Sequence, residues 1–302
     1  MAMTLLHIII LAIVQGFAEL LPISSSAHVI IAEKLMGLHV TSPKMTLLLV
    51  MLHTGTMFAV IVYFWKSWKE AYFSSREVFK RMAWRLIAAT LVTGVIGVGL
   101  FKIIDHTVLR NIPNAHIEDL FGKLNWIAPA LFAAGVMIIV AGLMRRREDR
   151  NDPTVEQDRE VTMRQSLWIG LVQGFAVPFR GFSRSGSTIS AGMLTGTTKR
   201  QSEVFSFALV IILTPAAIAK EALRALHEQH AQAHAAVAVS NGSIQISGLF
   251  LPSMIGMVFS FLAGLLALKW LSGWLENGRW YFFGIYCLFA SVVVYTLYLK
   301  GF

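Results

Sequence analysis

The chain has 302 residues, of which 56% are hydrophobic and 14% are charged, against roughly 25% charged residues in a soluble globular domain, so the composition predicts an integral membrane protein. Its one cysteine, Cys287, excludes a disulfide framework and a cysteine-based metal cluster. The net charge of +9 is spread between apolar segments, which favours basic loops beside anionic lipid over nucleic-acid binding.

The first predicted element is the short apolar helix within MAMTLLHIIILAIVQGFAELLP. A basic start and a small-residue cleavage site are missing there, so we do not interpret it as a cleaved signal peptide. Gln15, Glu19 and Pro22 interrupt the apolar run, which is too short for the about 20 residues that a membrane span needs. A short apolar helix that runs into a polar turn with proline predicts a re-entrant hairpin.

Six longer apolar segments are predicted to span the membrane as helices. Tryptophans stand at several of their ends, which is typical of anchors at the membrane interface. The six segments are Thr46–Trp65, Trp84–Ile104, Trp126–Met144, Val204–Leu223, Ile246–Trp270 and Trp280–Leu299.

The connections between these segments differ in charge, and the difference predicts the orientation. Lys66–Arg85 and Arg145–Arg164 are rich in lysine and arginine, whereas Asp105–Asn125 and Ala225–Gln245 hold few or none. Basic loops stay on the cytoplasmic side of a membrane. The first two connections are therefore predicted to be cytoplasmic, and the N-terminal hairpin and the C-terminus to lie on the outer side.

An internal repeat divides the sequence. VQGFA occurs at Val14–Ala18 and again at Val172–Ala176, and each copy is followed by proline and a serine-rich turn. Three predicted spans follow each copy. An odd number of spans makes the second copy enter the membrane from the opposite side, as in proteins built from inverted repeats around a shared site near the midplane.

The predicted fold class is therefore an all-α integral membrane protein with six transmembrane helices plus two re-entrant helical hairpins in an inverted-topology repeat. Residues 1–302 form one membrane domain. Residues 1–144 are the first inverted repeat and residues 163–302 the second, with the basic connection between them as the hinge.

The first hairpin carries a carboxylate inside an apolar segment. Gln15 and Glu19 are four residues apart and share one face of a helix. An ionisable group at membrane depth is costly and indicates function. A structural role for Glu19, paired with an arginine across the repeat, remains the alternative.

The turn after Pro22 holds Ser24, Ser25 and Ser26, and His28 follows within one helical turn. Any one of these serines can cap the next helix. Serine together with histidine and a carboxylate also supplies the parts of an activated nucleophile.

The second turn, GFSRSGST, predicts an anion site. Backbone N–H groups at the start of a helix bind phosphate, and Arg184 adds a bidentate donor, with Arg180 as a second. The alternative is an Arg184–Glu19 ion pair alone. The two turns together provide a hydroxyl, a histidine, a carboxylate, an arginine and a phosphate-binding turn, which fits phosphoryl transfer from an amphiphilic substrate.

These motifs resemble those of the undecaprenyl-diphosphate phosphatase family, which is also known for bacitracin resistance. The family carries an (E/Q)xxxE motif before a PxSSxxH turn, and a PGxSRSxxT motif in its second half. The resemblance covers nearly the whole chain. The matching residues are Gln15, Glu19, Pro22, Ser24, Ser25 and His28 in the first motif and Gly181, Ser183, Arg184, Ser185 and Thr188 in the second.

Two positions of these motifs bear on the mechanism. The first motif begins with Gln15 rather than glutamate, which the family permits but which weakens a mechanism that needs two carboxylates or a metal held by both. Arg180 replaces the proline before Gly181, so the approach to the second turn differs in shape.

The resemblance implies roles for the site residues. Ser25 is implied as the nucleophile, Glu19 and His28 as the acid–base groups, and Arg184 as the group that stabilises developing charge. Direct attack by water, without a phosphoseryl intermediate, remains open, as does the choice of base. The residues implied to bind substrate phosphate are Gln15, Ser24, Ser26, Gly181, Ser183, Ser185 and Thr188.

The implied activity is hydrolysis of undecaprenyl diphosphate to undecaprenyl phosphate and inorganic phosphate, in the bacterial inner membrane and on the periplasmic side. This reaction recycles the lipid carrier for peptidoglycan and cell-wall synthesis and confers bacitracin resistance. A divalent cation, Mg²⁺ or Ca²⁺, would be held partly by substrate phosphates, and no organic cofactor is expected. The expected partners are the polyprenyl diphosphate and membrane lipids but no nucleic acid, with a homodimer left open.

Two further interpretations of the sequence remain open. A polyprenyl-phosphate transporter or flippase would also use inverted repeats and a midplane arginine, but it would not require the Ser–His–Glu group. His227, His230 and His234 have helical spacing that could hold a metal, although a solvated surface is the simpler interpretation of a polar loop.

Overall fold

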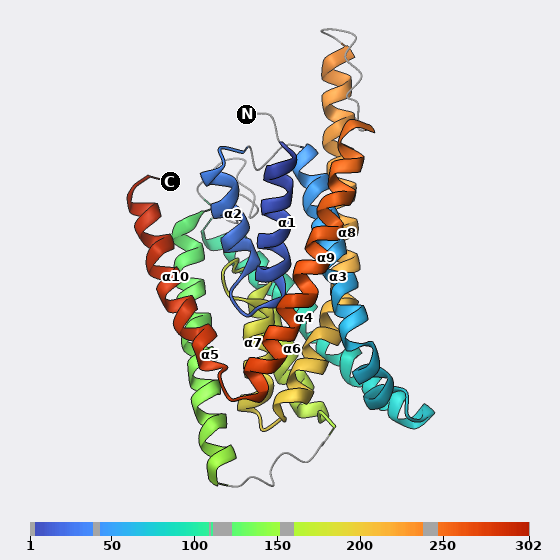
Figure 1. Cartoon of the computed structure of the whole chain (residues 1–302), viewed down its shortest axis with the longest axis vertical. Coiled ribbons are helices and arrows are strands. Elements are labelled where there is room, and N and C mark those ends of the chain that lie inside the picture. Colours follow the sequence, from blue (N-terminus) through green and yellow to red (C-terminus); the bar gives the residue numbers. More distant parts are fainter. Residues whose placement is uncertain are drawn as a thin grey trace.

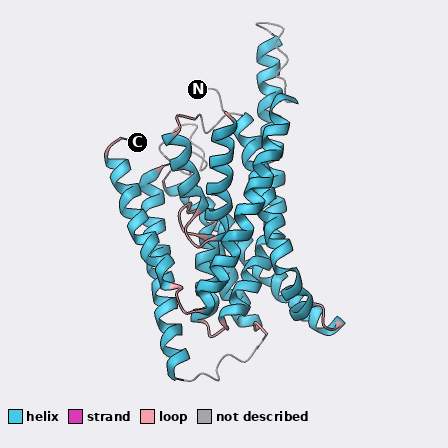
Figure 2. Cartoon of the chain, viewed as in Figure 1, coloured by secondary structure: helices cyan, strands magenta, loops and turns pink. Residues whose placement is uncertain are grey.

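The computed structural model describes residues 4–38, 43–108, 110, 123–151, 160–237 and 247–301, and every regular element among them is a helix (Figures 1 and 2). The helices are α1 (Leu5–Leu20), α2 (Ser25–Leu35), α3 (Pro43–Tyr72), α4 (Arg76–Thr107), α5 (Leu124–Asn151), α6 (Met163–Ala176), α7 (Arg184–Leu194), α8 (Lys199–Val237), α9 (Ser247–Glu276) and α10 (Tyr281–Leu299).

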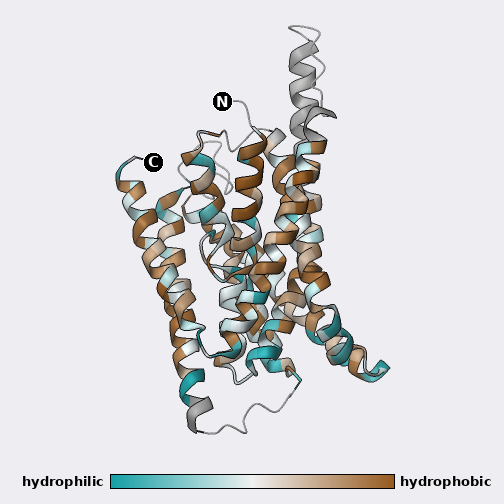
Figure 3. Cartoon of the chain, in the orientation of Figure 1, coloured by the Kyte–Doolittle hydropathy of each residue, from teal (hydrophilic) through white to brown (hydrophobic). Residues whose placement is uncertain are grey.

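Five of the described helices are long and apolar enough to cross a membrane. They contain Met45–Tyr72, Arg76–Thr107, Leu124–Arg147, Leu251–Glu276 and Tyr281–Leu299, and each coincides with a predicted span. Side chains such as Val95 and Phe289 are 71% and 69% exposed on them, which suits a lipid-facing surface (Figure 3). The chain is therefore an all-α, multi-pass membrane protein.

The remaining predicted span, Val204–Leu223, falls inside α8, which is one continuous helix. Several side chains in its later part lie outside the described residues, as do Ile246 at the start of the next predicted span and the side chains of His227, His230 and His234. Pro215 lies within α8 and does not end it.

Two pairs of short helices repeat one local design. Thr4 caps α1 and Thr162 caps α6, and each is part of a reciprocal capping box with the residue three positions later. The helices that follow, α2 and α7, both have 11 residues and begin after a serine, Ser24 or Ser183. Figure 1 shows the α1–α2 pair in the upper half of the molecule and the α6–α7 pair in the lower half.

Glycines bring the short helices against the long ones. A Cβ added at Gly16 would lie 2.6 Å from the Ala263 Cβ of α9, and one at Gly170 would lie 2.4 Å from the Ala89 carbonyl oxygen of α4. The Thr93 hydroxyl of α4 is 2.9 Å from the Gly170 carbonyl oxygen. Small residues permit such close backbone contacts between helices. Within a membrane, helices associate through van der Waals packing rather than through the hydrophobic effect.

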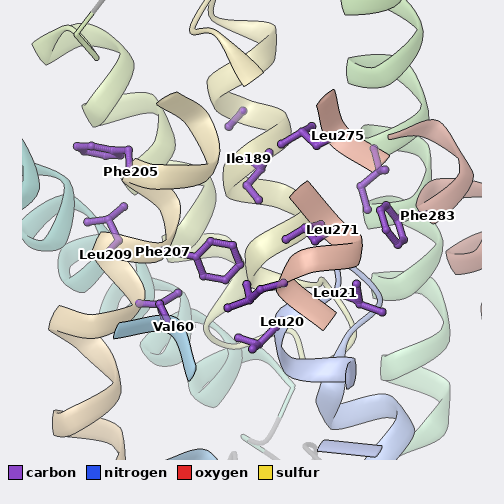
Figure 4. Packing of buried hydrophobic residues seen from close by; sticks show 14 of the residues in the cluster. Leu20, Leu21, Val60, Ile189, Phe205, Phe207, Leu209, Leu271, Leu275 and Phe283 are labelled. Atoms are coloured by element: carbon purple, nitrogen blue, oxygen red, sulfur yellow. The ribbon is translucent and has the colours of Figure 1, made fainter. Parts of the chain in front are cut away.

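The largest apolar core surrounds the turns of the short helices. Leu20 and Leu21 at the end of α1 lie beside Phe207 of α8 and Leu271 of α9, and Ile189 of α7 lies in the same cluster (Figure 4). Residues from both halves of the chain thus enclose the two turns, which fixes the turns relative to each other.

An ion-pair cluster ties the segment before α6 to the start of α4. Glu160 accepts hydrogen bonds from Arg81 at 3.0 Å and from Arg85 at 2.7 Å. These two bonds lower the pKa of the Glu160 carboxyl. The cluster joins two of the basic connections that the loop charge predicts to be cytoplasmic.

We expect Gly170→Ala to lower the midpoint of thermal unfolding in detergent, because the new methyl group meets backbone of α4 that cannot rotate away. Overpacking of this kind costs about 1–3 kcal/mol. Gly99→Ala on α4 is the matched control, since its added Cβ meets no described atom within 4 Å. Equal midpoints for the two variants would contradict close α4–α6 packing.

Candidate functional site

Glu19, in the last turn of α1, is the centre of a polar cluster. Its Oε2 accepts a hydrogen bond from the Ser25 hydroxyl at 2.6 Å and from Gln15 Nε2 at 3.2 Å. Its Oε1 forms an ion pair with Arg184. The Glu19 side chain is 10% exposed, so this carboxylate is largely withdrawn from water while both of its oxygens have partners.

The backbone between α1 and α2 places Ser25 against Glu19. α1 ends at Leu20, one residue before the extended Leu21 and two before Pro22. Ser24 then has a φ of 68°, in the left-handed region that residues with a side chain rarely adopt. This reversal lets α2 begin beside the end of α1, and strain of this kind clusters at functional sites.

The second turn brings Arg184 to the same place. Gly181 has a φ of 115°, and a Cβ there would lie 2.5 Å from the Ile127 carbonyl oxygen, so only glycine fits. The Ser183 hydroxyl caps α7 by accepting the Gly186 N–H at 3.3 Å, and α7 thus begins at Arg184. The Ser185 hydroxyl donates to the Leu21 carbonyl oxygen at 3.4 Å, which links the two turns directly.

A cavity of about 510 Å³ opens beside this cluster. Its polar end holds Glu19, Ser25 and Arg184, together with Gln15, Ser24, Ser26, Gly181, Ser183 and Ser185 from the predicted site. Its apolar wall includes Val98 and Leu213. The cavity therefore combines a charged end with an apolar wall, as an amphiphile with a polar head requires.

Two predicted site residues lie off this cavity. Thr188 is fully buried, donates to the Arg184 carbonyl oxygen at 2.8 Å and hydrogen-bonds the Ser206 hydroxyl, so its contacts join α7 to α8. His28 Nδ1 donates to the Ser24 carbonyl oxygen at 2.8 Å, and its Nε2 lies 2.6 Å from the Tyr286 hydroxyl. The His28 ring stacks on Tyr286 of α10 and is thus turned away from the Ser25–Glu19 bond.

A different histidine faces the carboxylate. His53 of α3 donates from Nδ1 to the Leu49 carbonyl oxygen at 2.8 Å, and its Nε2 lies 3.8 Å from Glu19 Oε2. His53 is not among the site residues predicted from the sequence. The available signal was an ionisable side chain inside the predicted span Thr46–Trp65, which indicates function by default.

Three more buried polar groups line the cavity and were also missed. Glu33 Oε1, Gln173 Oε1 and the Thr214 hydroxyl find no hydrogen-bond partner among the described residues. Gln173 occupies in the second VQGFA copy the place of Gln15 in the first, and this repeat was the signal for it. Buried polar atoms without protein partners are few in folded proteins, so their gathering at one cavity indicates a polar occupant.

The donor set fits a divalent cation only with help from a ligand. The described residues contain no group of three or more histidine, cysteine, aspartate or glutamate side chains that could hold a metal ion. Glu19 and Gln15 offer one carboxylate and one amide oxygen. Mg²⁺ prefers six oxygen ligands and commonly takes several of them from substrate phosphates and water.

Comparisons with known proteins agree with the motifs. The family model described as bacitracin resistance protein BacA matches residues 8–293. "Undecaprenyl-diphosphatase 2" of Acinetobacter baylyi is 54% identical over 296 residues, which cover 98% of this chain and 99% of that protein. "Undecaprenyl-diphosphatase 2" of Burkholderia ambifaria and "Undecaprenyl-diphosphatase 1" of Burkholderia pseudomallei are each 30% identical over 301 residues, covering 96% of this chain and 95% of each protein.

The matched region contains all but the first three residues of α1, the whole of α2, α6 and α7, and every residue of the polar cluster around Glu19. With a match of this extent, and with relatives aligned along nearly their whole length, the chain belongs to the family described as bacitracin resistance protein BacA.

Proposed function

We propose that this chain hydrolyses undecaprenyl diphosphate to undecaprenyl phosphate and inorganic phosphate. The observation that carries the proposal is the Ser25 hydroxyl, which donates at 2.6 Å to the Glu19 carboxylate within a cavity that also holds Arg184. The names of the relatives support the substrate. The reaction would recycle the lipid carrier of peptidoglycan synthesis and confer resistance to bacitracin.

In the proposed mechanism, Ser25 Oγ attacks the terminal phosphorus while Glu19 accepts the hydroxyl proton. The bond to the bridging oxygen breaks, and the lipid monophosphate leaves. Water then attacks the phosphoserine, which returns the hydroxyl and releases inorganic phosphate. Arg184 and the first N–H groups of α7 bind the terminal phosphate and offset its developing charge. Direct attack by water on the substrate is the alternative.

The two histidines receive different roles in this proposal. His53 Nε2 faces Glu19 Oε2, so we assign to His53 the transfer of the proton that Glu19 receives. His28 donates a hydrogen bond to the Ser24 carbonyl oxygen and so stabilises the strained turn at Ser24. Glu19 and His28 would thus both serve the nucleophile, one as base and the other as support.

We further propose that the protein lies in the bacterial inner membrane with six spans and two re-entrant hairpins, in inverted repeats over residues 1–144 and 163–302. The placement of α1–α2 and α6–α7 in opposite halves of the molecule supports this topology (Figure 1). The basic connections Lys66–Arg85 and Arg145–Arg164 support a cytoplasmic lower face. The site would then open to the periplasm.

The proposal includes Mg²⁺ or Ca²⁺ as an aid rather than a resident cofactor. Gln15 and Glu19 would supply protein oxygens, and substrate phosphates would supply others. A bound cation would offset the charge of the diphosphate. No organic cofactor enters the proposed reaction, and a homodimer remains a prediction from sequence.

A second candidate is translocation of a polyprenyl phosphate across the membrane. Helix pairs that enter from opposite halves resemble those of transporters, and a cavity with one charged end and one apolar wall suits a lipid phosphate. The Ser25–Glu19 hydrogen bond favours hydrolysis, because binding and release of a lipid require no activated hydroxyl.

We expect purified wild type to release phosphate from a polyprenyl diphosphate, and Ser25→Ala, Glu19→Gln and Arg184→Gln each to lose activity by about 10²-fold or more, since each removes a group that acts at the reacting phosphorus. Ser291→Ala is the matched control, because the Ser291 hydroxyl bonds only the Leu288 carbonyl oxygen of its own helix. Phosphate release is measured with Mg²⁺, with Ca²⁺ and without added metal.

Wild type that binds the lipid but releases no phosphate under any of these conditions would favour translocation. Full activity in Ser25→Ala, with loss in Glu19→Gln, would instead support direct attack by water.

The two histidines can be separated by comparing kinetics with stability. His53→Gln should lower kcat by about 10²-fold and leave the thermal midpoint nearly unchanged, because it removes the group to which Glu19 passes its proton. His28→Gln should lower the thermal midpoint, because it removes the hydrogen bond to the Ser24 carbonyl oxygen, and should reduce kcat less than His53→Gln does. The assignment is reversed if His28→Gln lowers kcat by about 10²-fold at an unchanged midpoint and His53→Gln does not.

A further inference from the structure

Two arginines four residues apart lie in the second half of the chain, Arg180 in the turn before α7 and Arg184 at the first position of α7. Arg184 pairs with Glu19 of the first half. Arg180 lines the same cavity, and so does Glu33, near the end of α2. The cavity is therefore lined by two guanidinium groups and two carboxyl groups.

Glu33 belongs to the most deeply buried polar residues of the protein. It is 1% exposed, and its Oε1 has no hydrogen-bond partner in the described part of the chain. A buried carboxylate with an open oxygen is costly unless a positive charge offsets it. Arg180, whose side chain is exposed, brings a positive charge to the same cavity, where its guanidinium can meet a ligand.

The proposed substrate has two phosphate groups, and the reaction treats them differently. The terminal phosphate must lie at Ser25 and Arg184, where attack takes place. The other phosphate remains on the lipid and gains negative charge as the bridging bond breaks. It must lie in the same cavity, between the terminal phosphate and the apolar wall that suits the prenyl chain.

We propose that Arg180 binds the phosphate that stays on the lipid, and that Glu33 positions Arg180 and competes with this phosphate for it. The inference rests on the proposed function. Arginine is suited to this role, because its planar guanidinium binds phosphate oxygens in pairs. Arg180 also stands where the related motif has proline, so the motif itself does not supply this group.

Product inhibition distinguishes the two phosphate positions. A polyprenyl monophosphate carries only the phosphate bound by Arg180, whereas inorganic phosphate occupies the position at Ser25 and Arg184. In Arg180→Gln we expect the inhibition constant of the polyprenyl monophosphate to rise about tenfold or more. The inhibition constant of inorganic phosphate should change less than about twofold. Arg180→Lys, which keeps the charge but not the paired donors, should give an intermediate value.

Glu33→Gln should change the inhibition constant of the monophosphate in the opposite direction from Arg180→Gln. Removing a negative charge beside the bound lipid phosphate should lower the inhibition constant of the monophosphate several-fold. A purely structural Arg180–Glu33 pair predicts weaker binding in both variants. Lys34→Gln is the control, because Lys34 neighbours Glu33 on α2 but does not line the cavity.

Two outcomes would overturn the inference: equal effects of Arg180→Gln on both inhibitors, or no effect on either, in an enzyme that still releases phosphate. Direct binding of the polyprenyl monophosphate is measured alongside. If wild type hydrolyses nothing, the proposed function fails by itself, and the binding ratio of wild type to Arg180→Gln still decides the role of Arg180.

Discussion

The ion pair between Glu19 and Arg184 joins a helix from the first half of the chain to a helix from the second half. Withdrawing two such charges from water costs several kcal/mol per ion unless each finds good partners. Gln15 and Ser25 occupy the second oxygen of Glu19, so the pair is stable only when both turns are in place. This requirement explains why the two turns are linked and why apolar residues from both halves enclose them.

The repeat builds one site rather than two because the halves differ at two positions. Aligning the VQGFA copies places Glu19 opposite Val177. Aligning the starts of α2 and α7 places Ser25 opposite Arg184. The first half therefore supplies the hydroxyl and the carboxylate, and the second half supplies the guanidinium, at one shared cavity. If the second half also carried a carboxylate at the position of Val177, two negative charges would lie at the same cavity and repel each other.

Composition and apolar length predicted the helical class and six spans, five of which coincide with helices long and apolar enough to cross a membrane, because these properties depend only on local sequence. The motifs also predicted the contact of Glu19, Ser25 and Arg184, since two interrupted helices with complementary charge have reason to meet. The directions of side chains were not predictable in the same way. His28 follows Ser25 by three residues, yet its ring is turned by Tyr286, which lies 258 residues further along the chain. His53 and Glu33 reach the cavity only through the packing of α2 and α3, which no local pattern specifies.

The partners of α1 have a consequence for the order in which the protein matures. α1 is synthesised first, but it packs against α9, and the turn that follows it is held through the Pro22 carbonyl oxygen by the thiol of Cys287 on α10. By contrast, α6 packs on α4, which precedes it on the ribosome. The second turn can therefore dock as it emerges, whereas the segment with the nucleophile must wait in the membrane for the last helices. A ribosome that stops before α9 leaves a chain that carries every reactive side chain but lacks the helix against which α1 packs.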